Sequence, residues 1–580
     1  MSEFAVGEEH FLLDGRPVRL LSGALHYFRV HEAQWGHRLA MLKAMGLNCV
    51  ETYVPWNLHE RESGRYDDVE ALGRFLDAVE AAGMWAIVRP GAYICAEWEN
   101  GGLPQWLTGP LGRRVRTADA AYLAEVERWF GRLLPQVAAR QIDRGGPVIM
   151  VQAENEYGSF GSDQAYLRRI VELLRDCGIT VPLFTSDGPE DHMLTGGSVP
   201  GVLATANFGS GAREAFEVLR RHQPAGPLMC MEFWCGWFDH WGKDHVVRDP
   251  ADAAAALREI LECGASVNIY MAHGGSNFAG WAGANRSGDL HGGELLPDVT
   301  SYDYDAPVDE AGLPTEKYWR FREVLAAYAV GPLPDVPDAP PRLGAPAQGT
   351  AGEWAPLSDV LEVLGDEEVA SPVPPTFEEL GVDRGIVRYR TEVPGPRRPY
   401  PLRVSGLRDL ATVTVDGVRA GLLDAEDAVL DEPVAGPAAV ELWVESLGRV
   451  NYGPRLAEPK GITVGVLHER QYLHGFRAQG LRLEAFGDAE AVAKVPFRAV
   501  EGAEPGLYRV TLDMAAPGDA GLELPGWTRG FVWVNGFCLG RYWAAGPQKS
   551  LFVPGPVLRG GANEVWVLEL DRGGEDVRLG

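Results

Sequence analysis

Cysteines, basic runs and long apolar stretches are scarce in this sequence. Its seven cysteines are scattered, odd in number and without the C-x-x-C spacing of a zinc site. This pattern argues against a disulfide framework and favours a reducing compartment. An uncharged apolar stretch of about 18 residues, which a membrane-spanning helix needs, is missing as well. We therefore expect neither a disulfide scaffold nor a membrane-spanning segment.

Basic residues are also fewer than acidic ones. Asp and Glu number 81 against 53 Lys and Arg, which gives a formal net charge of -28 at pH 7. Such a chain repels nucleic-acid phosphates and anionic membranes, so a neutral substrate is the more natural partner. The first residues, MSEFAVGEEHFLLDG, are acidic where a signal peptide is basic, and they lack its apolar centre. We expect a cytoplasmic protein without nucleic-acid or membrane partners.

Residues 1–330 alternate strand-like apolar runs with amphipathic helical segments such as EALGRFLDAVEAAG, which ends in the C-capping Gly83. Eight β-then-α units over this length predict an α/β fold, a parallel (β/α)8 TIM barrel. The eight strand candidates are VRLLSGALHY, CVETYVPW, WAIVRPGAYI, PVIMVQAENEY, LFTSDG, VLATANFG, PLMCMEFW and SVNIYMAHGG.

The pattern changes after residue 330. Residues 331–350 carry six prolines, and we interpret 331–374 as a Pro-rich linker, within which 351–374 lends a strand to one of the modules that follow. Beyond it, short alternating runs such as ATVTVDG and GFVWVNGFCLGRYW predict two all-β domains. We place a β-sandwich at 375–495 and a galactose-binding-like jelly roll at 496–580.

Carboxylates follow two of the predicted barrel strands. The run PVIMVQA is followed by Glu154, Asn155 and Glu156, and PLMCM is followed by Glu232. Active sites of such barrels lie at the carboxyl ends of the strands. A single strand-end glutamate often only caps a helix or pairs with an arginine. Two of them, among aromatic residues such as Trp237, favour sugar chemistry, since a glycosidic bond needs one carboxylic acid and one carboxylate.

Metal chemistry has no such support. The histidines near the barrel loops lack H-x-H and H-E-x-x-H spacing, so we predict no metal and no cofactor. They are His59, His240, His273 and His291. Cys230 and Cys235 flank Glu232; we expect Cys230, which alternates with the glutamate along a packed strand, to be structural, and the role of Cys235 near the barrel mouth stays open.

Collinear motifs reveal a resemblance to a known family. ETYVPWNLHE, VRPGAYICAEWENGGLPQWL, QAENEYG, EFWCGWFDHWG, GGSNFAGWAGA and TSYDYDAPVDEAG resemble the glycoside hydrolase family 35 β-galactosidases, and RVNYGPRL and GWTRGFVWVNGFCLGRYW extend the likeness into the β domains. The family is a retaining one. The resemblance therefore implies Glu156 as the acid/base and Glu232 as the nucleophile.

The resemblance also implies a galactose pocket. It places Asn155 on the hydroxyl at sugar carbon 2, Trp237 as a wall, and Glu154 in supporting hydrogen bonds. It implies that Tyr302 lies near the nucleophile, with Tyr304 as the alternative. The other implied pocket residues are Tyr53, Cys95, Ala96 and Glu97. Secreted members of the family have a disulfide at the position of Cys95, for which no partner is evident here.

The sequence thus predicts an exo-acting, retaining β-galactosidase that removes terminal, non-reducing galactose from short β-galactoside oligosaccharides. Two alternatives stay open: an exo-glycosidase for another sugar, such as a glucosaminide, and a non-catalytic galactoside-binding protein. Tyr452 in RVNYG is a candidate for the leaving-group side. The preferred linkage, sugar binding by the β domains and a homodimer also stay open.

Overall fold

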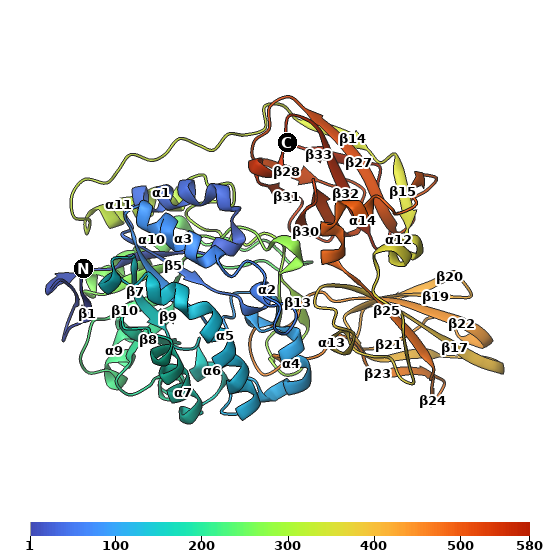
Figure 1. Ribbon diagram of the computed structural model, residues 1–580, viewed down its shortest axis with the longest axis horizontal. Coiled ribbons are helices and arrows are strands. Elements are labelled where there is room, and N and C mark those ends of the chain that lie inside the picture. The colour runs from blue at the N-terminus through green and yellow to red at the C-terminus, as the bar shows by residue number, and fades with distance from the viewer. Residues whose placement is uncertain (1) are drawn as a thin grey trace.

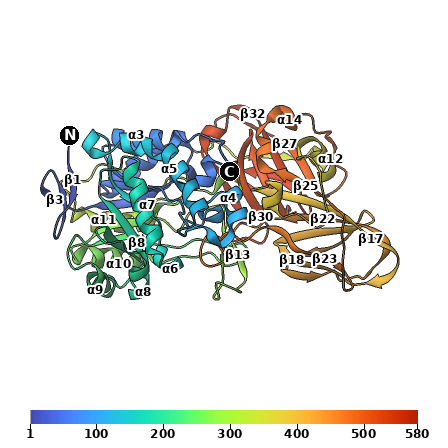
Figure 2. The ribbon, with the colours of Figure 1, turned by 60° about the horizontal axis from the view of Figure 1, so that its bottom comes forward.

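A computed structural model describes residues 2–580. Figure 1 shows a barrel wrapped in helices, coloured blue to green, beside β domains coloured yellow to red. Figure 2 shows the same order from another side, with β17 and β23 at the end away from the barrel. Within residues 2–580, no helix is long and apolar enough to cross a membrane.

Eight parallel strands close into a barrel, which confirms the predicted TIM barrel and all eight predicted strands. Every residue of the fourth strand, and nearly every residue of the others, is buried, because helices cover the outside while side chains fill the inside. The strands are β4 (Leu21–Leu25), β5 (Cys49–Tyr53), β6 (Trp85–Arg89), β7 (Val148–Gln152), β8 (Leu183–Asp187), β9 (Leu203–Phe208), β10 (Met229–Trp234) and β11 (Ser266–His273).

The surrounding helices begin and end at recognisable signals. Asp119 accepts hydrogen bonds from the first amides of α5, and Asp163 and Asp249 do the same for α7 and α10. Gly83 follows α3 with φ 66°, as its predicted capping role requires. The main helices are α1 (Trp35–Met45), α3 (Ala71–Ala81), α5 (Ala120–Ala139), α7 (Gln164–Asp176), α8 (Asp191–Gly197), α9 (Ala212–His222), α10 (Pro250–Glu262) and α11 (Glu316–Ala326).

Short elements complete the barrel. A three-stranded antiparallel sheet lies near the amino ends of the barrel strands, where the Gly226 amide donates to the Glu8 carbonyl. A small hairpin, β12 and β13, lies in the loop after β11. These elements are β1 (Phe4–Val6), β2 (Phe11–Leu13), β3 (Arg16–Val18), α2 (Trp56–His59), α4 (Gln105–Leu111), α6 (Tyr157–Phe160), β12 (Ala284–Arg286) and β13 (Leu295–Pro297).

The first β domain is a sandwich of a six-stranded and a four-stranded sheet. Its inward-facing residues, such as Val387, Val404 and Leu442, form a separate core. The strands are β16 (Val369–Ser371), β17 (Gly385–Tyr400), β18 (Leu402–Arg408), β19 (Leu410–Val415), β20 (Val418–Leu423), β21 (Asp427–Val429), β22 (Val434–Glu445), β23 (Gly461–His468), β24 (Gln471–Tyr472) and β25 (Phe476–Arg482), and α13 (Phe377–Leu380) precedes β17.

The second β domain again pairs a six-stranded with a four-stranded sheet, so both predicted all-β domains are confirmed. Its elements are β14 (Ala347–Thr350), β15 (Glu353–Pro356), α12 (Leu357–Leu364), α14 (Ala489–Val492), β26 (Arg498–Ala499), β27 (Gly506–Met514), β28 (Ala520–Glu523), β29 (Arg529–Val534), β30 (Phe537–Trp543), β31 (Ser550–Val553), β32 (Gly561–Glu569) and β33 (Asp576–Leu579).

The Pro-rich segment contributes strands to both β domains. β14 and β15 pair with β33 and β27 of the second domain, and β16 pairs with β25 of the first. The connection without helix or strand therefore extends over residues 331–346, and Figure 1 shows it running along the molecule from α11 to the second domain. Proline suits such a segment because it stiffens the chain without requiring a partner strand.

Candidate active site

The two predicted glutamates lie at the barrel mouth, the end of the barrel where the strands' carboxyl ends open. Glu156 follows β7, and Glu154 and Glu156 both adopt left-handed backbone conformations, with φ of 60° and 45°. Such a conformation costs roughly 1–2 kcal/mol for a non-glycine residue and persists where the surroundings impose it. Here the Glu156 amide donates to the Ser186 carbonyl at 3.1 Å, which holds the turn against β8.

Glu232 lies on β10 and is surrounded by donors. Arg89 Nη2 donates to its Oε1 at 2.6 Å, and Tyr53 donates its hydroxyl to the same oxygen at 2.8 Å. Trp234 Nε1 donates to Oε2 at 3.1 Å. A buried cation and two neutral donors stabilise a negative carboxylate, which is the form a nucleophile requires. Glu232 therefore has hydrogen-bond donors on both of its oxygens.

Glu156 has the opposite environment. Asn207 Nδ2 donates to its Oε1 at 2.9 Å, and no cation lies in contact with it. Burial and, next, the negative charge of Glu232 raise the pKa of Glu156 to about 8. At neutral pH Glu156 is therefore mostly protonated. The pair combines a proton donor with a charged nucleophile, the division of labour that a glycosidic bond needs.

Both glutamates line one cavity of about 230 Å³ at the barrel mouth. This volume is below the range of drug-sized pockets and suits a small ligand. All predicted site residues except Tyr302 line the cavity. The lining residues are Tyr53, Cys95, Ala96, Glu97, Asn155, Glu156, Glu232, Trp234, Trp237, Phe238, Tyr270, Asn285, Tyr304 and Tyr452.

Tyr304 lies at the cavity, and Tyr302 lies behind it. The Tyr302 hydroxyl donates to Glu97 Oε2 at 2.5 Å, and its ring packs against the Arg29 guanidinium at 3.7 Å. Tyr302 therefore contacts the pocket through Glu97, whereas Tyr304 lines the cavity directly. The two tyrosines alternate along the loop, and their sequence positions do not say which one faces inward.

The segment from Cys95 to Glu97 has an unusual backbone. These three residues are all left-handed, with φ of 59°, 59° and 49°. Arg29 donates to the carbonyl of Ala96 and so supports the turn from below. Burial raises the pKa of Glu97 to about 7, although the Tyr302 hydrogen bond and the Arg29 charge act in the other direction. The turn presents a carboxyl and a thiol to the cavity.

Glu154 lies outside the cavity lining. Arg116 contacts both of its oxygens, at 2.9 and 2.7 Å, and Tyr166 donates its hydroxyl at 2.8 Å. The amide of Asn155 also donates to Glu154, at 2.6 Å. A bidentate, buried pair of this kind fixes geometry. Glu154 thus holds the backbone of Asn155.

The cysteines and histidines show no metal site. All seven cysteines are free, and Cys230 and Cys235 donate to the backbone carbonyls of Phe208 and Met271. Burial raises the pKa of the Cys95 thiol well above its usual value, so it is a neutral thiol. Among residues 2–580, no group of three or more metal-ligating side chains is present.

Several site residues were missed by sequence reasoning. Arg89 is the last residue of the buried strand β6 and Asn207 the second-last residue of β9, so the strand-end signal that pointed to Glu156 also marked them. Asn285 and Tyr270 gave no such signal. Tyr452, which the sequence offered only as a candidate, lines the cavity although it belongs to the first β domain.

An eight-stranded parallel barrel with this glutamate pair at its mouth defines a glycoside hydrolase. The model of the glycosyl hydrolases family 35 matches residues 10–328, more than half of the chain. Models of a β-galactosidase first all-beta domain and a β-galactosidase galactose-binding domain match residues 374–482 and 505–563. The chain belongs to glycoside hydrolase family 35.

The chain is similar in sequence to β-galactosidase relatives along nearly its whole length. The beta-galactosidase-1-like protein of Mus musculus is 39% identical over 98% of this chain and 90% of its own length. The beta-galactosidase of Homo sapiens is 38% identical over 98% of this chain and 87% of its own length. This chain is therefore a glycoside hydrolase of the β-galactosidase type, and its substrate is a carbohydrate.

Proposed function

We propose that the protein is a retaining exo-β-galactosidase that releases terminal, non-reducing β-D-galactose from short oligosaccharides. The observation that carries the proposal is the unequal pair of glutamates in one small cavity. Glu232 accepts hydrogen bonds from Arg89 and Tyr53, whereas burial beside Glu232 keeps Glu156 protonated. A cavity of about 230 Å³ favours a single sugar ring and thus exo action.

In the first step, Glu232 attacks the anomeric carbon and forms a glycosyl ester. The bond between that carbon and the glycosidic oxygen breaks, and the electron pair leaves with the oxygen. Glu156 donates its proton to this oxygen, so the leaving group departs as a neutral alcohol. Arg89 and Tyr53 hold the nucleophile in place during the attack.

In the second step, the ester has removed the negative charge of Glu232. Burial still raises the pKa of Glu156, but the second cause, the negative charge of Glu232, is then absent. Glu156 is a carboxylate at this point because it has given its proton to the leaving group. It takes a proton from water, and the oxygen of that water attacks the anomeric carbon from the face that the leaving group vacated. The bond to Glu232 breaks, and galactose leaves in its β form.

The other cavity residues bind the sugar in this proposal. Asn155 holds the hydroxyl at carbon 2, and Glu97 accepts from further hydroxyls. Trp237, whose side chain is 40% exposed, offers an apolar ring to one face of the sugar. Tyr304, which lines the cavity where Tyr302 does not, contacts the sugar in this proposal. The free cysteines support a reducing, cytoplasmic location.

A glucosaminide is less well supported as the substrate than a galactoside. A charged amine on the sugar requires a carboxylate without another partner. Glu97 is the third carboxyl of the cavity, and it already accepts from Tyr302 and lies near Arg29. The cavity therefore suits a neutral hexose better than an amino sugar.

Proton NMR of the reaction with an aryl β-D-galactoside tests the proposal. We expect β-galactose to appear first and α-galactose to follow only by mutarotation. Initial α-galactose would show an inverting enzyme, in which Glu232 does not act as nucleophile. Absence of release, combined with turnover of an aryl β-glucosaminide, would show a different sugar specificity.

A further inference from the structure

One segment of the first β domain packs against the barrel. We call residues 449–460, which lie in the connection between β22 and β23, the strap. Leu456 and Ala457 of the strap are buried in the hydrophobic core of the barrel and not in that of the β domain. Asn451 accepts a hydrogen bond from the Tyr93 hydroxyl at 2.7 Å through its carbonyl. The strap is thus part of the barrel mouth in space, though not in sequence.

The strap brings two residues to the cavity. Tyr452 is one of its own residues and lines the cavity directly. Val450 forms a parallel bridge with Ala284, and the Asn451 amide donates to the Ala284 carbonyl at 3.0 Å. The residue after Ala284 is Asn285, which also lines the cavity. A displacement of the strap therefore moves cavity residues of two domains.

One carboxylate joins the two ends of the strap. Glu378 on α13 accepts from the Arg449 guanidinium at 2.7 Å with Oε1 and from the Lys460 amide at 3.0 Å with Oε2. Arg449 also donates to Glu99 of the barrel, at 2.6 Å from Nη1 and 2.7 Å from its backbone amide. The strap is consequently a closed loop of the Ω type, anchored to the barrel at its first residue.

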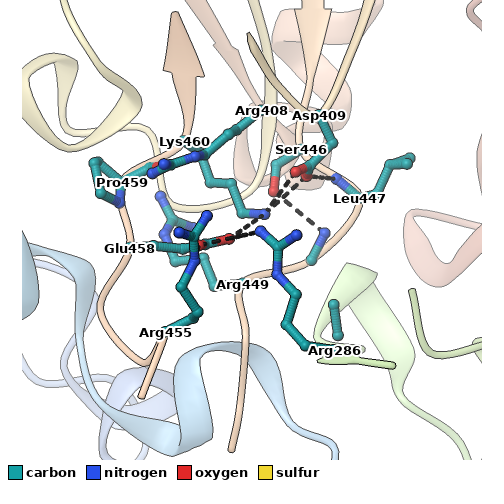
Figure 3. A network of polar contacts seen from close by, with 12 residues as sticks. Arg286, Arg408, Asp409, Ser446, Leu447, Arg449, Arg455, Glu458, Pro459 and Lys460 are labelled. Atoms are coloured by element: carbon teal, nitrogen blue, oxygen red, sulfur yellow. Dashed lines mark hydrogen bonds and ion pairs between the residues drawn. The ribbon is translucent and has the colours of Figure 1, made fainter. Parts of the chain in front are cut away.

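A second buried ionic cluster holds the other half of the strap (Figure 3). Glu458 pairs with Arg286 of β12 at 2.9 Å and with Arg455 of the strap at 2.7 Å. Lys460 is fully buried and pairs with Asp409 at 2.8 Å. The Arg286–Glu458 pair is the ionic contact between the strap and the hairpin that carries Asn285.

Such pairs determine position more than stability. Buried ion pairs recover little more than the cost of removing their charges from water, but breaking one leaves a charge unpaired. Burial alone would raise the pKa of Glu458; the charges of Lys460 and Arg286 outweigh it, and the pKa is lowered. Glu458 is therefore charged at neutral pH. A different position of the strap would separate Glu458 from Arg286 and leave the buried Arg286 guanidinium without this carboxylate, while Glu458 would keep Arg455.

We propose that Glu458 is a positioning residue for the active site: through Arg286 it holds Tyr452 and Asn285 at the cavity entrance, where the leaving group lies, and so sets the preference among β-galactosides. The inference rests on the proposed function. It assigns part of the substrate specificity of the barrel to the first β domain.

The position of Tyr452 supports the leaving-group side. Tyr452 shares the cavity wall with Glu156, the proposed acid, which must contact the oxygen between sugar and leaving group. Burial and then the charge of Glu156 raise the pKa of Tyr452 to about 12, which is consistent with their proximity. Ser159, whose hydroxyl donates to the Glu156 carbonyl at 2.8 Å, lies close enough to lower the pKa of Tyr452 in the opposite direction.

The test compares Glu458→Gln with a matched control, Glu445→Gln. Both carboxylates lie in the first β domain, are at most 6% exposed and pair with two arginines, but Glu445 pairs with Arg529 and Arg541 of the second β domain. The readout is the ratio of kcat/KM for lactose to kcat/KM for a nitrophenyl β-galactoside. Since the sugar is the same, a general loss of activity cancels in this ratio.

We expect Glu458→Gln to change the ratio by about tenfold, since small misplacements in an active site have large effects on rate, and Glu445→Gln to change it less than twofold. In a Tyr452→Ala background, Glu458→Gln should add less than about a twofold further change, because both act through the same contact. A ratio that Glu458→Gln leaves unchanged, or that both variants change equally, would overturn the role of Glu458.

The outcomes separate this inference from the proposed function. A wild-type protein that releases galactose from neither substrate overturns the proposed function and, with it, the role of Glu458. A wild-type protein active on both, with an additive double variant, overturns the role of Glu458 alone.

Discussion

Individual residues decide the chemistry at this site. Glu156 and Glu232 are the same type of residue, and their roles differ because their contacts differ. Arg89, itself fully buried, contacts Glu232 and not Glu156. Arg89 thus holds Glu232, whereas burial and then the charge of Glu232 raise the pKa of Glu156.

The first residue-scale prediction concerns Glu232. Glu232→Ala should lose nearly all turnover and keep its fold, because the carboxylate lies in a cavity and not in the packed core. Added azide should restore turnover and yield an α-galactosyl azide, since the small anion fits the space of the lost carboxylate and attacks from the same face. Turnover close to wild type without azide would remove Glu232 from the role of nucleophile.

The second residue-scale prediction concerns the pH dependence of the reaction and its origin in Glu156. The first step needs protonated Glu156, and its pKa is raised to about 8. The rate constant kcat/KM should therefore fall as pH rises through about 8, because the acid form is lost. Glu156→Gln should lower kcat/KM for lactose by about 10²–10⁴-fold and abolish this alkaline limb. An unchanged limb in the variant would assign the titration to another group.

At the scale of elements, close contacts between loops shape the cavity. Gly236 after β10 packs so tightly that a Cβ would lie 1.8 Å from the Tyr304 carbonyl oxygen. Glycine is needed there because any side chain must displace the loop that carries Tyr304. The loops after β10 and β11 are therefore in direct backbone contact.

We expect Gly236→Ala to lower kcat/KM for a nitrophenyl β-galactoside by at least about tenfold by displacing Tyr304. Gly131→Ala is the control: Gly131 lies within α5, nothing surrounds its added Cβ, and the change should be neutral or stabilise by about 1 kcal/mol. Equal kinetics in both variants would show that the loop contact does not shape the cavity.

At the scale of the whole molecule, the two β domains are joined by a buried charge cluster. Glu445 of the first domain accepts from Arg529 at 2.6 Å and from Arg541 at 2.7 Å, both in the second domain. Apolar side chains of the two domains, including Leu481 and Trp566, share one cluster beside it. The two β domains therefore share a buried interface that is both ionic and apolar.

Glu445→Gln should destabilise the protein by about 3–5 kcal/mol, because two buried guanidinium groups lose their counter-charge. Burial alone would raise the pKa of Glu445, but Arg541 and Arg529 outweigh it and the pKa is lowered in the folded state. The stabilisation is therefore complete above about pH 4.5, the usual value for a glutamate, and is lost as pH falls further. Thermal unfolding should show a gap between variant and wild type at pH 7 that narrows below pH 4.5. A gap independent of pH would exclude this charge effect.

The sequence predicted much of this molecule because the signals were local. Eight apolar runs of strand length, each followed by polar residues, predicted the barrel, and the position of Glu156 and Glu232 after two of them predicted the site. Arg89 and Asn207 lie in the last two residues of their strands, and reading every strand end would have found them. Tyr302 and Tyr304 could not be told apart, since the orientation of a loop residue depends on what packs behind it.

The sequence by itself determined the barrel, the two β domains and the positions of the two glutamates at the strand ends, because periodicity and strand ends are properties of short segments. Only the tertiary structure decided what surrounds those glutamates. Arg89 contacts Glu232 because β6 and β10 lie on opposite sides of the barrel and their side chains extend toward each other inside it. Tyr452 lines the cavity because buried ion pairs hold the strap at the barrel mouth. Contacts between distant segments depend on packing and charge in three dimensions, which no local pattern encodes.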